Sequence, residues 1–148
     1  MNIVVLKPGE GRVIPLGSIG MVVQEDGTQT RATLGVATFE VPPHAPTPPP
    51  HIHRTFEEGF YILEGDLEFL AGTETVRASQ GTWVMVPIAT VHTFSNPTDK
   101  PARFLNTFTP PLYLGYFEAM SKLIQEDGVL DAQQMAELMA SYDTEVVS

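Results

Sequence analysis

Hydrophobic and polar residues alternate along short segments through most of this chain. In residues 56–63, for example, alternation places Phe60 and Ile62 on one face of an extended strand and Glu57 on the other. Segments of this kind, rich in β-branched and aromatic residues and separated by glycine, proline or asparagine, predict strands. The predicted strands are residues 2–7, 12–15, 19–24, 33–41, 56–63, 67–70, 74–78, 82–86, 91–95 and 102–109. Short strands at this spacing predict an all-β antiparallel sandwich or barrel.

Two helices are predicted after residue 111, where the apolar spacing changes to three or four residues. The apolar positions are Tyr113, Phe117, Met120 and Ile124 in the first helix, and Met135, Leu138, Met139 and Tyr142 in the second. Gly128 can end the first helix, and Asp131 with Gln134 resembles a capping box that begins the second. Because an apolar helical face must be buried, the helices are predicted to cover an open side of the barrel. A lid over a pocket and a dimer contact are the alternative interpretations.

The length and charge of the chain exclude several classes of protein. At 148 residues, the chain is predicted to form one domain, 1–148, with a barrel over residues 1–110 and a helical extension over residues 112–142. A net charge of −10 argues against nucleic acid as a partner. No apolar run could span a bilayer and the N-terminus lacks signal-peptide features, so no membrane partner is expected. The absence of cysteine excludes disulfides and thiolate metal sites, and it favours a cytoplasmic location.

A proline-rich segment from Pro42 to Pro50 interrupts the alternation. Because proline has no backbone N–H, this segment is predicted to be a stiff loop rather than a strand. It is interpreted either as a connector or as a rigid rim that shapes the entrance of a site. His44 lies in this loop, where a solvent-exposed position is expected, with a role as an extra metal ligand or a substrate contact as the alternative.

The candidate chemistry of the chain begins directly after this loop. His51 and His53 are two residues apart, so on an extended strand both imidazoles point to the same face and can share one ion. Glu57 and Glu58 follow, and His92 offers a third imidazole farther along the chain. Nitrogen and oxygen ligands suit one divalent transition metal, whether Fe, Mn, Ni, Co, Cu or Zn. Alternation alone does not decide which glutamate faces the histidines.

Four neighbouring residues have plainer interpretations. Arg54 and Glu64 are predicted to be solvent-facing charges. Tyr61 and Trp83 are interpreted as aromatic residues of the core or of a subunit interface.

The segment around the two adjacent histidines resembles the first motif of the cupin superfamily. That motif reads Gly, five residues, His-x-His, three or four residues, Glu, six residues, Gly. His51, His53, Glu58 and Gly65 stand at these spacings, and the six-residue interval to Gly65 selects Glu58 over Glu57. The leading glycine of the motif is alanine here, at position 45.

A second segment resembles the other cupin motif, which reads Gly, five residues, Pro, x, Gly, two residues, His, three residues, Asn. The matching positions are Gly81, Pro87, His92 and Asn96. Ala89 replaces the glycine that follows the proline, at a cost of about 1–2 kcal/mol if the turn needs a positive φ. The resemblance covers residues 35 to 110.

The resemblance implies a fold and a ligand set. The implied fold is a double-stranded β-helix, or jelly-roll cupin barrel, with two C-terminal helices after it. The implied ligands of one divalent metal ion are His51, His53, Glu58 and His92. Most cupins pair through sheet edges, so the resemblance also implies a homodimer in which edge strands are covered.

The resemblance also implies a metal-dependent enzyme with a small-molecule substrate. Its first form is a quercetinase-like dioxygenase, an oxidoreductase in which Glu58 binds the metal and also takes a proton from the substrate hydroxyl. Phe60, Ile62 and Phe94 share the ligand faces of their strands, so an apolar, aromatic pocket for a flat, oxygenated substrate is expected. The alternatives are a non-redox polyketide cyclase or isomerase, and a non-catalytic metal- or ligand-binding barrel.

Overall fold

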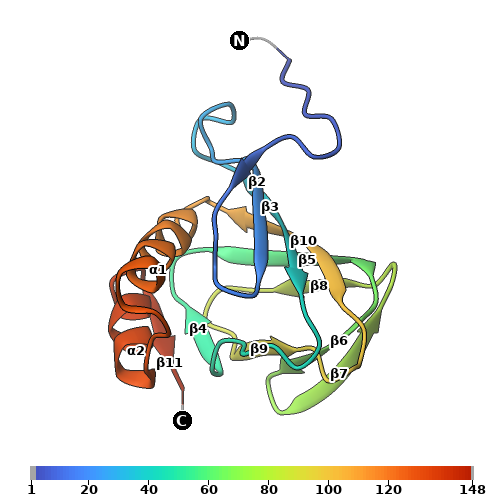
Figure 1. Ribbon diagram of the computed structural model, residues 1–148, viewed down its shortest axis with the longest axis vertical. Coiled ribbons are helices and arrows are strands. Elements are labelled where there is room, and N and C mark those ends of the chain that lie inside the picture. The colour runs from blue at the N-terminus through green and yellow to red at the C-terminus, as the bar shows by residue number, and fades with distance from the viewer. Residues whose placement is uncertain (1–2, 148) are drawn as a thin grey trace.

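Two antiparallel sheets face each other, with two helices beside them, in the computed structural model, which describes residues 3–147 (Figure 1). The strands are β1 (Arg12–Val13), β2 (Gly20–Glu25), β3 (Gly35–Val41), β4 (His51–His53), β5 (Glu57–Glu64), β6 (Asp66–Ala71), β7 (Glu74–Ser79), β8 (Trp83–Val86), β9 (His92–Ser95), β10 (Ala102–Thr109) and β11 (Thr144–Val146). The helices are α1 (Leu114–Asp127) and α2 (Ala132–Ala140). The strand order is β1-β2-β3-β10-β5-β8 in the larger sheet and β11-β4-β9-β6-β7 in the smaller. The fold is the predicted double-stranded β-helix.

The core lies between the two sheets and is largely aromatic. Phe60 on β5 meets Phe69 on β6 edge to face, with ring centroids 5.0 Å apart. Phe94 on β9 meets Phe104 on β10 in the same way at 5.2 Å. Each pair joins one sheet to the other, and edge-to-face pairs add about 0.5–1.5 kcal/mol to the effect of burial. These contacts fix the distance between the sheets, which sets the position of everything that projects between them.

The predicted first strand, residues 2–7, is wrong for the part that the structure describes. Residues 3–7 form no strand, and Ile3 and Val5 are 93% and 71% exposed. Asn2 lies outside the described residues. The predicted strand 12–15 is shortened to β1, which pairs only with β2. Apolar residues favour a strand only where a partner strand can accept their hydrogen bonds, and residues 3–7 have none among the described strands.

The C-terminal region contains both predicted helices and one strand that was not predicted. The capping box of α2 is confirmed, with the Asp131 side chain accepting from the Gln134 backbone and the Gln134 side chain accepting in return. Gly128 ends α1 with a φ of 82°. After α2 the chain returns as β11 and pairs with β4, the strand that carries the adjacent histidines. The extension is therefore part of the smaller sheet as well as a cover over one side of the barrel (Figure 1).

The outer face of the larger sheet exposes two aromatic residues that the sequence suggested for the core or an interface. Tyr61 and Trp83 are 43% and 52% exposed, so the core interpretation is wrong. The Trp83 ring lies over Gly59, where an added Cβ would come within 2.2 Å of it. A subunit interface here stays a prediction, which the sedimentation coefficient of the purified protein tests. Among residues 3–147, neither helix is long and apolar enough to cross a membrane.

Candidate metal centre

Four side chains converge between the sheets near the end of the barrel that the helices cover. His51 and His53 come from β4, His92 from the neighbouring β9, and Glu58 from β5 in the opposite sheet. One ligand atom from each lies within 4.8 Å of all the others. All four residues are buried, with at most 4% of their surface exposed. The structure thus brings together the four residues that the sequence singled out.

The backbone fixes the ring orientation of two of the histidines. His51 Nδ1 lies 2.7 Å from the carbonyl oxygen of Pro49, and His92 Nδ1 lies 2.9 Å from that of Thr90. A carbonyl oxygen only accepts, so each Nδ1 carries the hydrogen and donates it. With the hydrogen held on Nδ1, loss of the other ring hydrogen leaves the lone pair on Nε2, which is the form of imidazole that binds a metal.

The third histidine is oriented by a residue from the far end of the chain. His53 Nδ1 lies 2.8 Å from Thr144 Oγ1, on β11. Thr144 Oγ1 donates its own hydrogen to the carbonyl oxygen of Tyr142 at 3.1 Å, so it accepts from His53. Nothing in the sequence pointed to Thr144, because the two residues are 91 positions apart and β11 is only three residues long.

Thr144→Val is expected to weaken Zn²⁺ binding by about 10- to 100-fold, the usual cost of losing a residue that orients a metal ligand. Valine has nearly the shape of threonine but cannot accept the His53 hydrogen. Competition with a chromophoric chelator measures the affinity, and Thr144→Ser, which keeps the hydroxyl, should bind as the wild type does. Wild-type affinity in the valine variant would show that Thr144 does not orient His53.

The charges in the cluster favour a cation at its centre. Glu58 Oε2 lies 2.9 Å from both His53 Nε2 and His92 Nε2. Burial raises the pKa of Glu58, but these hydrogen bonds outweigh it and hold the pKa well below its usual range. Burial lowers the pKa of His92, but its bond to Glu58 outweighs that effect and raises it. Burial, with the nearby His92, lowers the pKa of His51 to about 4, so His51 is neutral at pH 7.

This donor set fits a single divalent transition metal. Three imidazoles and an ionised carboxylate are nitrogen and oxygen ligands, which such metals bind readily. A divalent ion would replace the proton shared between Glu58 and its two histidines, leaving a charge of +1 on the site. The four side chains could therefore hold one metal ion, and the donor set does not select among Fe, Mn, Ni, Co, Cu and Zn.

The barrel also matches known proteins. Residues 37–108 match the family model described as a cupin domain. The fold is similar to that of KdgF from Halomonas sp., with a TM-score of 0.61 and 18% identity over 70% of this chain and 92% of that one. Residues 37–108 form a cupin domain. This cupin is also similar in fold to a predicted oxalate decarboxylase from Thermotoga maritima, with a TM-score of 0.60 and 20% identity over 64% of this chain and 82% of that one.

A curated relative of this cupin is the polyketide synthase CurC from Streptomyces cyaneus. The two are 37% identical over 82 residues, which is 52% of this chain and 52% of that protein. The match therefore spans about half the length of that relative.

The two alanines that replace motif glycines in this cupin behave differently. Ala89 has a φ of 60°, so the turn keeps the left-handed backbone that glycine would favour. Its N–H donates to the carbonyl oxygen of His53 at 2.7 Å, which ties the turn before His92 to β4. Ala45 does not have a positive φ, and the preceding residue, His44, adopts one of 55° instead. With both replacements present, the ligands on β4 and β9 still converge.

Other candidates near the cluster lie outside it. Glu57 is exposed on the opposite face of β5, so the motif spacing chose the correct glutamate. The His44 side chain is 62% exposed and lies 3.1 Å from Asp99, so it is not a metal ligand. Arg54 and Glu64 are solvent-facing, as predicted.

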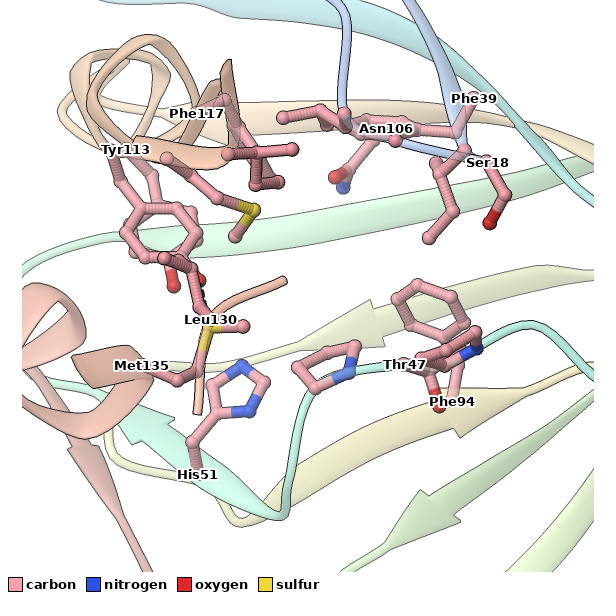
Figure 2. Close-up of a pocket in the computed structure, with 18 of the residues that line it drawn as sticks. Ser18, Phe39, Thr47, His51, Phe94, Asn106, Tyr113, Phe117, Leu130 and Met135 are labelled. Carbon is pink, nitrogen blue, oxygen red and sulfur yellow. Dashed lines mark hydrogen bonds between the residues drawn. The ribbon is translucent and has the colours of Figure 1, made fainter. Parts of the chain in front are cut away.

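The metal centre opens into a cavity of about 270 Å³ (Figure 2). Its walls come from the inner faces of both sheets, from the proline-rich loop at 46–48 and from the two helices. The loop is therefore a rim of the site, and the helices line the pocket in addition to covering the barrel. Apolar residues dominate the lining, many of them aromatic, and among the described residues that line it there is no lysine or arginine. The predicted apolar, aromatic pocket is confirmed for Phe60 and Phe94, whereas Ile62 lies in the core and does not line it.

Proposed function

We propose that this cupin is a metal-dependent enzyme that closes or rearranges a ring in an aromatic, hydroxylated, polyketide-type substrate. One observation carries the proposal: the cluster of three histidines and a glutamate opens, through His51, Glu58 and His92, into a cavity whose other walls are largely apolar and aromatic. Flat rings can stack on walls such as Phe60, Phe94 and Phe104. The 37% identity with a polyketide synthase supports the same substrate class.

The absence of lysine and arginine from the described cavity lining argues against small anionic substrates. A buried phosphate or carboxylate without a cationic partner costs several kcal/mol, by the same physics that penalises an unpaired buried charge. A bound metal ion could pair with one such group only. An uncharged substrate with phenol, enol or ketone oxygens therefore fits this cavity better than oxalate would, although the fold is shared with a predicted oxalate decarboxylase.

Each residue of the site has a separate role in this proposal. His51, His53, Glu58 and His92 would hold the ion, which would polarise a substrate oxygen and favour its ionised form. The ionised carboxylate of Glu58 accepts the proton of the substrate hydroxyl. Tyr113 lines the same space, and burial, with nearby Tyr116, raises its pKa, so its hydroxyl stays protonated. The aromatic walls exclude water from the ring that reacts.

The quercetinase-like dioxygenase is the second candidate. The same nitrogen and oxygen ligands accept redox-active Fe, Mn, Ni, Co or Cu, and an apolar cavity beside them can admit dioxygen. Both candidates share the first step, which is removal of a substrate proton by Glu58. They differ in whether oxygen is consumed.

Metal analysis combined with turnover in air and under nitrogen separates these functions. The purified protein is analysed for metal and incubated with hydroxylated aromatic polyketides and flavonols. Turnover that is equal with and without oxygen, and that Zn²⁺ supports, is expected from the ring-closing enzyme. Oxygen uptake with a redox-active metal would establish the dioxygenase instead, and tight binding without turnover across both sets of compounds would establish a binding protein.

A further inference from the structure

We propose that Asn106 orients the substrate, its side-chain carbonyl accepting a hydrogen bond from a hydroxyl on a ring position away from the oxygen beside Glu58. The inference rests on the proposed function, because it concerns how the same cavity holds a hydroxylated aromatic ligand. Asn106 lies on β10, is only 2% exposed, and lines the cavity among phenylalanines. Its amide projects into the space between the sheets (Figure 2).

One hydrogen bond fixes which way the amide faces. Asn106 Nδ2 donates to the carbonyl oxygen of Gly59 at 2.8 Å. Because that oxygen can only accept, the atom facing it must be the nitrogen, and Oδ1 takes the other position. Oδ1 has no hydrogen-bond donor among the described residues, and it is not one of the sealed, unpaired polar atoms of the interior. The carbonyl is thus left for a donor that enters the cavity.

The strand register places this carbonyl at a useful distance from the metal centre. Phe108 pairs with Glu58 across β10 and β5, and Asn106 pairs with Phe60. Asn106 and Glu58 therefore share the inner face as diagonal neighbours, whose Cα atoms lie about 7–8 Å apart in such a sheet. A single aromatic ring spans the space between two side chains placed in this way. A ligand with one oxygen at the metal centre can therefore present a second hydroxyl to Asn106.

A purely structural role explains the amide nitrogen of Asn106 but not its carbonyl oxygen. The hydrogen bond to Gly59 uses one hydrogen of the Asn106 amide. The carbonyl oxygen of the same amide lies in a wall that is otherwise apolar at this point. An occupant that fills the cavity covers this carbonyl, so binding is favoured when the occupant supplies a donor to it. Sites of this kind discriminate against ligands that lack the matching hydroxyl.

The test uses hydroxyanthraquinones as probes and the full chain loaded with Zn²⁺. 1-Hydroxyanthraquinone offers a ketone and a phenol to the metal centre, and its dihydroxy isomers differ only in where a second hydroxyl lies. Calorimetric titration should show at least one isomer binding about 3- to 10-fold more tightly than the parent, the range of one neutral hydrogen bond. Asn106→Leu should abolish that gain, so that the dihydroxy isomers bind no more tightly than the parent. If the leucine variant has no cooperative thermal transition, Asn106→Ala takes its place with the same expectation.

Thr107→Val is the matched control. Thr107 Oγ1 accepts from the N–H of the same Gly59 at 3.1 Å, but Thr107 does not line the cavity. The control should keep the gain, which excludes a general disturbance of β5 and β10. A gain that persists in both Asn106 variants, or equal binding of all isomers by the wild type, overturns the inference and leaves the proposed function standing. Failure of the parent probe to bind the Zn²⁺-loaded protein overturns both.

Discussion

Replacement of His92 by alanine is expected to strip the metal from the protein while the barrel stays folded. The variant loses one of the three imidazole ligands. Its affinity for the metal should therefore fall by more than the roughly 10- to 100-fold that is lost when a residue that only orients a ligand is replaced. His92 lies outside the aromatic pairs Phe60–Phe69 and Phe94–Phe104 that join the sheets, so the fold does not depend on it. Elemental analysis after dialysis measures the metal, and circular dichroism with a thermal melt reports the fold.

His44→Ala is the matched control for this experiment. His44 is also a histidine of this chain, but its side chain is exposed and pairs with Asp99 away from the centre. Its removal should change neither metal content nor melting temperature. Full metal occupancy in His92→Ala would show that the four residues are not the ligand set, whatever the activity of the variant.

Glu58→Gln is expected to lower turnover by about 100- to 10,000-fold, the range that a positioned proton acceptor contributes to a rate. Glutamine keeps the size of the side chain and one oxygen for the metal, but it cannot take a proton from the substrate. In the wild type, the ionised carboxylate of Glu58 can accept that proton. Rates are compared at saturating Zn²⁺, so that weaker metal binding in the variant is separated from the lost proton transfer.

Glu57→Gln is the control for that variant. It makes the same chemical change one residue away on β5, where the side chain points outward and is exposed. Its turnover should match the wild type. A Glu58→Gln variant that keeps wild-type turnover with metal bound would remove Glu58 as the proton acceptor and leave it only as a ligand.

Local sequence signals predicted much of this fold. The strand predicted at 102–109 has the same bounds as β10. Its alternating sequence pattern corresponds to alternate side chains that are buried in the core. The capping box at Asp131 and the end of α1 at Gly128 depend only on residues within a few positions, and both were predicted correctly. The segment 3–7 has the same apolar composition as a strand but stays irregular, since strand formation requires a partner and composition does not supply one.

The spacing of the two motifs also determined which residues could form the metal centre. The period of an extended chain placed His51 and His53 on one face, whereas Glu58 and His92 followed from the spacings of the first and second motifs. Tertiary structure alone decided that β4 and β9 lie side by side and that Glu58 reaches them from the opposite sheet. It also decided that Thr144 holds His53 and that the carbonyl of Asn106 is left facing the cavity. The physical reason is distance along the chain: a repeating pattern fixes the direction of neighbouring side chains, whereas contacts between residues far apart in the sequence exist only once the sheets have packed.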